Sequence, residues 1–287
     1  MSKLTVSSTF NLFYSGSEDR VERIRDGLKF FGDHGFGAAE IGAESFDLLG
    51  DGWRAQVEAA AEDSKRMGVT FTTAHLPFLG GGGVKDEEFM KMFDTKMRNA
   101  IEAMALLGVN YAVMHPNAPT MPLKKFSRQE QYDSVMNHLS PYVEYADKVG
   151  LSVVVENMRV ISGMRLSHRY CQDPDELCDI ADALGVGVCW DFGHANISGL
   201  KQSEALAYVG KRLKAIHVND NSGIDDDHVA PFMGNVDWRD AMHGLKLTEY
   251  NGTFNFEVST KAIPKDLRSS FADYLMNASR ELISYID

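Results

Sequence analysis

Short apolar segments that each end in one polar side chain recur along this chain. Residues 153–155 are three valines in a row, and β-branched residues in succession favour a strand over a helix. A strand this apolar is typical of a sheet that is covered on both faces, as parallel sheets are. The carboxylate of Glu156 follows at once. Five further apolar segments end in the same way, in His75, His115, Asp191, His217 and Glu257.

Patterns typical of helices lie between these strands. In residues 18–31 the apolar side chains recur at helical spacing, and Gly68, Gly108, Gly150 and Gly185 each stand just past a predicted helix end. The intervals between strand ends suit β/α units. We therefore predict an α/β fold, a single (β/α)8 TIM barrel. Its strands are expected at residues 4–9, 38–41, 69–75, 109–115, 151–156, 186–191, 215–219 and 252–258, and its helices at 18–31, 53–67, 86–107, 127–149, 174–184, 203–213, 237–245 and 267–286.

Length and composition agree with one soluble domain. A chain of 287 residues is of ordinary size for an α/β barrel, and no linker or shift in composition divides residues 1–287. The formal net charge of -12 opposes binding to nucleic acid or to an anionic membrane. The three cysteines form no CxxC pair, and the N-terminus carries no long apolar run. We expect a cytoplasmic protein without signal peptide or membrane span; assembly into a homo-oligomer stays open.

Four of the polar strand ends belong together. Glu156, Asp191, His217 and Glu257 end four consecutive strands, and a parallel barrel places its chemistry at that end of the strands. Three carboxylates and an imidazole suit Mn²⁺, Mg²⁺, Co²⁺ or Zn²⁺. Alone, each could be an ordinary solvated residue of a loop. Together, the carboxylates would repel one another unless a cation neutralised them, so the sequence predicts one divalent metal ion here.

The loops after these strands make the chain recognisable. Asp191 is followed by His194, His217 by Asn219 and Asp220, and a later Asp226 by His228. These patterns resemble the xylose isomerase-like TIM-barrel superfamily, which includes sugar isomerases, sugar epimerases and endonuclease IV. In its sugar epimerase branch the resemblance implies one metal ion, often Mn²⁺, on Glu156, Asp191, His217 and Glu257. The two glutamates would also be the catalytic acid/base pair, and His194 would lie behind the ligands.

The resemblance also admits a second interpretation. Endonuclease IV holds three Zn²⁺ ions through nine ligands, and the positions of its additional ligands are filled here by residues of suitable type. With a single metal ion, the same residues would line the substrate pocket instead. They are His75, His115, His194, Asp226 and His228.

Charge decides between these interpretations. An enzyme acting on DNA meets a dense row of phosphates with Lys and Arg, whereas residues 218–237 contain neither and include Asp220 and the run 225–227. We therefore predict a metal-dependent isomerase or epimerase of a sugar, sugar phosphate or cyclitol, working by proton transfer next to a carbonyl. An endonuclease IV-like phosphodiesterase is the alternative, and a catalytically inactive metal-binding protein a third. Arg159 could meet a substrate phosphate or carboxylate, although an exposed loop arginine is the commoner interpretation.

Overall fold

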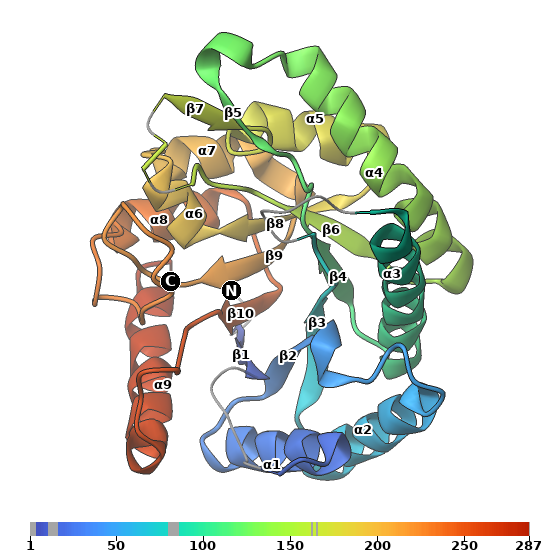
Figure 1. The fold of residues 1–287 in the computed structure, drawn as a ribbon. Coiled ribbons are helices and arrows are strands. Elements are labelled where there is room, and N and C mark those ends of the chain that lie inside the picture. The colour runs from blue at the N-terminus through green and yellow to red at the C-terminus, as the bar shows by residue number, and fades with distance from the viewer. Residues whose placement is uncertain (1–3, 11–16, 80–85, 162, 165, 287) are drawn as a thin grey trace.

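The computed structural model describes residues 4–10, 17–79, 86–161, 163–164 and 166–286. Within this part of the chain, eight parallel strands form a closed barrel (Figure 1). The first strand pairs with both the second and the last, which closes the sheet. The predicted (β/α)8 architecture is confirmed. In order around the barrel, the strands are β1 (Thr5–Thr9), β2 (Ala38–Gly42), β3 (Thr70–His75), β4 (Tyr111–Met114), β6 (Val153–Glu156), β8 (Gly187–Asp191), β9 (Leu213–Val218) and β10 (Thr253–Phe256).

Helices surround the barrel and connect its strands (Figure 1). They are α1 (Arg20–Asp33), α2 (Trp53–Met67), α3 (Glu87–Leu107), α4 (Arg128–Val149), α5 (Pro174–Leu184), α6 (Phe192–Ile197), α7 (Gln202–Val209), α8 (Trp238–Leu247) and α9 (Arg268–Ser284). Short 3₁₀ turns are η2 (Ala43–Ser45), η3 (Leu123–Lys125), η4 (Gly210–Arg212) and η5 (Lys265–Leu267). As predicted, α2, α3, α4 and α5 end at glycines in the left-handed conformation. In the described residues, no helix combines the length and hydropathy needed to span a membrane.

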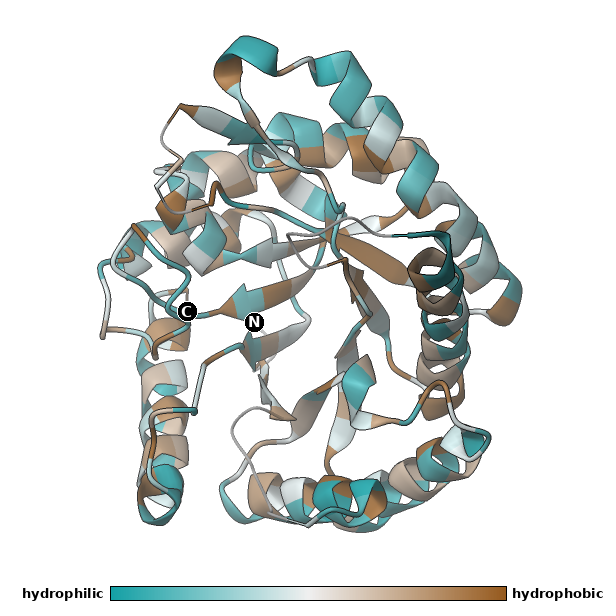
Figure 2. Cartoon of the chain, viewed as in Figure 1, coloured by the Kyte–Doolittle hydropathy of each residue, from teal (hydrophilic) through white to brown (hydrophobic). Residues whose placement is uncertain are grey.

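Alternation along the strands decides which side chains enter the barrel. Val113, Val154, Cys189 and Ala215, on four neighbouring strands, form a small buried cluster apart from the main core. The neighbouring residues Met114, Val155, Trp190 and Ile216 belong instead to the main core; β6 is hydrophobic along most of its length (Figure 2). Side chains two positions apart share a face of a strand. The next residues on the inner face are therefore His115, Glu156, Asp191 and His217.

Three elements that follow strands of the barrel were not predicted. β5 (Thr120–Pro122) and β7 (Ser167–Arg169) form a separate antiparallel sheet within segments that the sequence indicated to be loops. Strands of three residues are too short for an apolar alternation to be recognised. Helix α6 was also missed, since its six residues cover fewer than two turns. Helix α6 follows β8 directly and carries His194, so it belongs to the surroundings of the site.

A buried ion pair fastens β7 to helix α5. His168 Nε2 lies 2.9 Å from both carboxylate oxygens of Glu176, and the amide of Cys171 donates to Glu176 Oε2 at 3.0 Å. Burial opposes protonation of His168, but the Glu176 carboxylate outweighs it, and the pKa of His168 is raised above its ordinary value. The small sheet is therefore held by a charged contact with α5 as well as by the backbone pairing of β5 with β7.

We predict that His168→Ala lowers the free energy of unfolding by about 1–3 kcal/mol at pH 6, because a buried carboxylate loses its partner. A histidine whose pKa is raised by folding contributes its full stabilisation below its unfolded pKa of about 6.5, and loses it as pH rises through the folded value. The difference between wild type and variant should therefore shrink between pH 6 and pH 9 in urea titrations. His243→Ala, at an exposed position, is the control. A difference that is constant or grows with pH would contradict the assignment.

Candidate metal centre

Four side chains from successive strands meet inside the carboxyl end of the barrel. We call Glu156, Asp191, His217 and Glu257 the central group; one ligand atom from each lies within 4.8 Å of the others. Glu156, Asp191 and His217 are almost wholly buried, whereas 17% of the Glu257 side chain is exposed. Glu156 and Asp191 end β6 and β8, His217 lies on β9, and Glu257 follows β10 directly. The four residues that the sequence selected as ligands are thus adjacent in space.

The imidazole of His217 lies at the middle of this group. Its Nδ1 is 3.0 Å from Glu156 Oε1 and 3.1 Å from Glu257 Oε2. Its other nitrogen, Nε2, is 3.1 Å from Glu40 Oε2 on β2, across the barrel. Burial disfavours a charge on this ring, but the acidic groups around it raise the pKa of His217 well above its ordinary value. The protonated ring can donate from Nε2 to Glu40 and from Nδ1 to Glu156 or Glu257. If Glu40 keeps the Nε2 proton, loss of the Nδ1 proton leaves that lone pair for a metal ion.

Asp191 is fixed from several directions. Asn219 Nδ2 donates to its Oδ2 at 2.7 Å, and the amide of His194 donates to its Oδ1 at 2.6 Å, so that Asp191 also caps α6. Asn157 bonds both the amide and the carbonyl of Asp191. Gly193 permits this packing, since a Cβ there would lie 1.9 Å from Asn219 Oδ1. The carboxylate of Asp191 is therefore held in one orientation.

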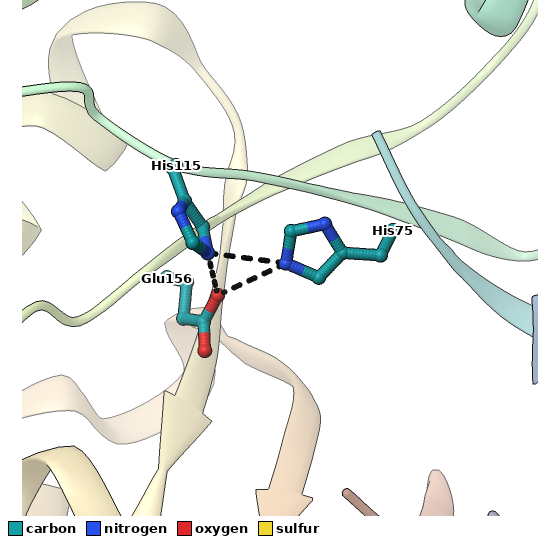
Figure 3. Close-up of side chains that lie close together, drawn as sticks. All are labelled: His75, His115 and Glu156. Carbon is teal, nitrogen blue, oxygen red and sulfur yellow. Dashed lines mark hydrogen bonds and ion pairs between the residues drawn. The ribbon is translucent and has the colours of Figure 1, made fainter. Parts of the chain in front are cut away.

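A second group lies beside β3 and β4. This β3–β4 group consists of His75, His115 and the shared Glu156, whose side chains point toward one another (Figure 3). His115 Nε2 is 2.9 Å from Glu156 Oε2 and 3.1 Å from His75 Nε2. His75 Nδ1 donates to the carbonyl of Leu76 at 2.9 Å, which leaves Nε2 to face the group. Glu156 thus directs Oε1 to the central group and Oε2 to this one.

The two imidazoles of the β3–β4 group differ in protonation. Burial opposes a charge on His75, but Glu156 outweighs it and raises the pKa of His75 to about 9. Burial also acts on His115, where Glu156 does not compensate fully, and the pKa falls to about 4. The ring of Phe78 stacks on His115 with centroids 4.5 Å apart. One charged and one neutral imidazole can share a proton across the 3.1 Å contact between their Nε2 atoms.

A third group is built from loops. The loop group comprises His194, Asp226 and His228. His194 Nδ1 donates to the carbonyl of Asn157 at 2.7 Å, and His228 Nδ1 donates to the carbonyl of Glu257 at 2.8 Å. Their Nε2 atoms consequently face Asp226 Oδ2, at 3.6 and 3.2 Å. Arg159 joins the same oxygen, with Nε 3.0 Å from Asp226 Oδ2, so the expectation of an exposed loop arginine is wrong.

These residues fit a divalent cation. Glu156 Oε2 is buried and faces the imidazole nitrogens of His115 and His75, at 2.9 and 3.6 Å. Burial and the charges of Glu156 and Glu257 raise the pKa of Asp191 to about 6, the result expected of crowded carboxylates. The donors are oxygens and imidazole nitrogens, which Mn²⁺, Zn²⁺ and similar ions accept. The buried cluster is therefore consistent with a metal site.

Comparison with known proteins identifies the family. The family described as "Xylose isomerase-like TIM barrel" matches residues 28–275. The chain belongs to this family. An uncharacterised protein of Methanocaldococcus jannaschii, MJ1311, is 27% identical over 243 residues, covering 82% of this chain and 79% of its relative. An uncharacterised protein of Sinorhizobium fredii, y4fM, is 28% identical over 170 residues, 56% of this chain and 51% of that protein.

Solved structures share the fold of this xylose isomerase-like chain. A D-tagatose 3-epimerase-like protein superposes with a TM-score of 0.73 at 22% identity, covering 98% of both chains. A xylose isomerase domain protein from Alicyclobacillus acidocaldarius reaches 0.76 at 16% identity, over 99% of both. The 3-keto-D-glucoside 4-epimerase YcjR of E. coli reaches 0.71 at 18% identity, over 97% of this chain and 100% of its own. At these identities the likeness establishes the fold.

Glu40 is the main residue that the sequence analysis did not select. It ends no long apolar run, and its contact with His217 joins β2 to β9, which lie far apart in sequence. Asn157 and Asn219 were likewise recognised only as neighbours of ligands. Glu40 could have been recognised only by its position, since it lies near the end of its strand, as the six selected residues do.

We predict that Glu40→Gln weakens Mn²⁺ binding by about 10–100-fold, because loss of a carboxylate behind a ligating imidazole typically has an effect of this size. Calorimetric titration of the purified, metal-stripped protein measures it. Glu44→Gln, four residues along and exposed, is the matched control. Unchanged affinity in a folded Glu40→Gln protein would show that Glu40 does not act through His217.

Proposed function

We propose that this protein is a divalent-metal-dependent isomerase or epimerase that acts on a sugar, sugar phosphate or cyclitol by proton transfer next to a carbonyl. The observation that carries the proposal is the pair of glutamates around one imidazole nitrogen: Glu156 and Glu257 lie 3.0 and 3.1 Å from His217 Nδ1. Two carboxylates on either side of a substrate carbon are what inversion at that carbon requires.

The central group would hold the cation through Glu156, Asp191, His217 and Glu257, with Mn²⁺ the first expectation and Mg²⁺, Co²⁺ or Zn²⁺ as alternatives. When bound, the metal ion would supply Lewis acidity that polarises a substrate carbonyl and acidifies the adjacent C–H bond. Glu40 would keep the His217 ring turned toward it, and Asn219 would do the same for Asp191.

The two glutamates would move the proton. Although burial opposes ionisation, the His217 charge lowers the pKa of Glu257 to about 2 and that of Glu156 well below its ordinary value. Both side chains are therefore carboxylates at neutral pH and able to accept a proton. One carboxylate would take the proton from the carbon beside the carbonyl. The other, after gaining a proton from water, would deliver that proton to the opposite face, and the first would release its proton to water. Return to the same carbon is epimerisation; return to the neighbouring carbon is aldose–ketose isomerisation.

Other residues would serve the substrate. His75 and His115 lie beside the same glutamate, so their shared proton is available to a substrate oxygen there. Phe78, with half of its side chain exposed next to His115, offers an apolar face for a sugar ring. The names of the structural relatives, which include epimerases of tagatose, allulose and a 3-keto-glucoside, support a sugar as substrate.

Proton transfer can be tested with solvent deuterium. We predict that a ketohexose accepted by the enzyme, sought among D-fructose, D-tagatose and D-allulose, gains deuterium in D₂O at the carbon that changes, as seen by NMR. Glu156→Gln and Glu257→Gln should each lower turnover by at least about 10²-fold, because an amide cannot accept the proton. Glu144→Gln, on the exposed face of α4, is the control. Product that forms without deuterium would rule out transfer through these carboxylates.

A second candidate function rests on the number of donor groups. The central, β3–β4 and loop groups together bring nine ligand residues to the barrel mouth, enough for up to three Zn²⁺ ions and an endonuclease IV-like phosphodiesterase. The net charge of -12 and the acidic residues 225–227 argue against approach of a DNA duplex.

We therefore predict that the protein, supplied with Zn²⁺, neither binds nor cuts a duplex with an abasic site at moderate salt. Gel-shift and strand-cleavage assays measure the two effects, with a protein-free reaction as the background. Efficient cleavage that is lost in His228→Ala would establish the second function in place of the first.

A further inference from the structure

The loop group already contains a fixed positive charge. Arg159 stands three residues beyond Glu156, and its Nε lies 3.0 Å from Asp226 Oδ2. The ion pair is largely sheltered, since the two side chains are 21% and 19% exposed. The guanidinium also donates from Nη1 to the carbonyl of Val160 at 3.3 Å, which fixes its orientation. A guanidinium remains protonated at any ordinary pH.

The guanidinium contacts the oxygen that a metal ion would need. Asp226 Oδ2 is the atom that His228 Nε2 and His194 Nε2 face, at 3.2 and 3.6 Å. A cation bound by both imidazoles and by this oxygen would therefore share the oxygen with Arg159. A metal ion and a guanidinium on the same carboxylate oxygen are two positive charges close together, and they repel strongly where water screens little.

The charge balance differs between the groups. The central group contributes three carboxylates and one imidazole, so a divalent cation is more than neutralised there. The loop group has one carboxylate, which Arg159 already neutralises, and two imidazoles. A metal ion would add two positive charges to a group whose single negative charge is already paired with Arg159.

A second guanidinium, that of Arg169, adds to the positive charge of Arg159. Arg169, on β7, donates from Nε to the carbonyl of Ala118 at 3.0 Å. Burial and then the charge of Arg159 lower the pKa of Arg169, with Glu156 and Asp226 opposing the change. Arg169 therefore adds positive charge to that of Arg159.

We propose that the guanidinium of Arg159 is the resident cation of the loop group and excludes a metal ion from it. Metal binding is then confined to the groups that contain Glu156. Arg159 acts as a specificity residue, because it prevents binding of the third metal ion that an endonuclease IV-like phosphodiesterase would use. It also holds Asp226, His194 and His228 as a polar wall beside the central group. The inference rests on the metal chemistry of the proposed function, but it concerns a different set of donors.

The test is the number of Zn²⁺ ions bound per chain, measured by elemental analysis after equilibration with Zn²⁺ and removal of free ion. Arg159→Gln should bind one ion more than wild type, because an uncharged side chain leaves Asp226 Oδ2 available. Arg159→Gln combined with Asp226→Asn should return to the wild-type number. Arg159→Lys, which keeps the charge, should also match wild type.

Arg25→Gln is the matched control, since Arg25 Nε makes the same kind of contact, 2.9 Å from Asp63 Oδ2, between α1 and α2. It should leave the Zn²⁺ count unchanged. Asp226→Asn in the wild-type background should also leave the Zn²⁺ count unchanged. This variant tests the proposal even if Arg159→Gln does not fold.

Two results would overturn the proposal. One is a wild-type protein that loses an ion on Asp226→Asn, which would mean that the loop group binds metal beside Arg159. The other is a folded Arg159→Gln protein with no additional ion. Failure of the proposed function would give a different result. In that case His217→Ala would bind as many ions as the wild type, because no ion would depend on His217.

Discussion

The arrangement of the central group depends on the imidazole of His217, which lies among three carboxylates. One ring nitrogen faces Glu40, and the other faces Glu156 and Glu257, all at 3.0–3.1 Å in a buried environment. Without positive charge, these carboxylates would repel one another where water screens little. A protonated His217 supplies some of that charge, and a divalent cation that takes the place of its Nδ1 proton would supply more. The site is therefore built to favour a cation, and the proposed chemistry follows from this electrostatic need.

The fold makes the arrangement rigid. Glu156, Asp191 and His217 continue the inner face of three neighbouring strands, directly above Val154, Cys189 and Ala215, and Glu257 follows the next strand. A strand holds its side chains more firmly than a loop does, which suits groups that must converge on one point. The loop group is assembled differently: Asp226 and His228 belong to the segment after β9, and Arg159 comes from the segment after β6. This difference agrees with a metal centre on the strands and a polar wall on the loops.

Much of this site could be predicted from the sequence, because a parallel barrel fixes where the ends of its strands lie. His75, His115, Asp191 and Glu257 each follow an apolar run, and strand order alone brings such residues together. Glu40 could not be selected, because its contact with His217 forms only when the barrel closes. The pairing of Arg159 with Asp226 was also out of reach, since it depends on two loops whose paths no periodicity describes. The same holds for the short sheet of β5 and β7.

The most direct test of the central claim is a crystal structure of the protein grown with Mn²⁺, with anomalous data collected at the manganese edge. We expect an anomalous peak within coordination distance of Glu156, Asp191, His217 and Glu257. A well-ordered structure with no peak among these four side chains, under conditions in which Mn²⁺ binds elsewhere or not at all, would contradict it.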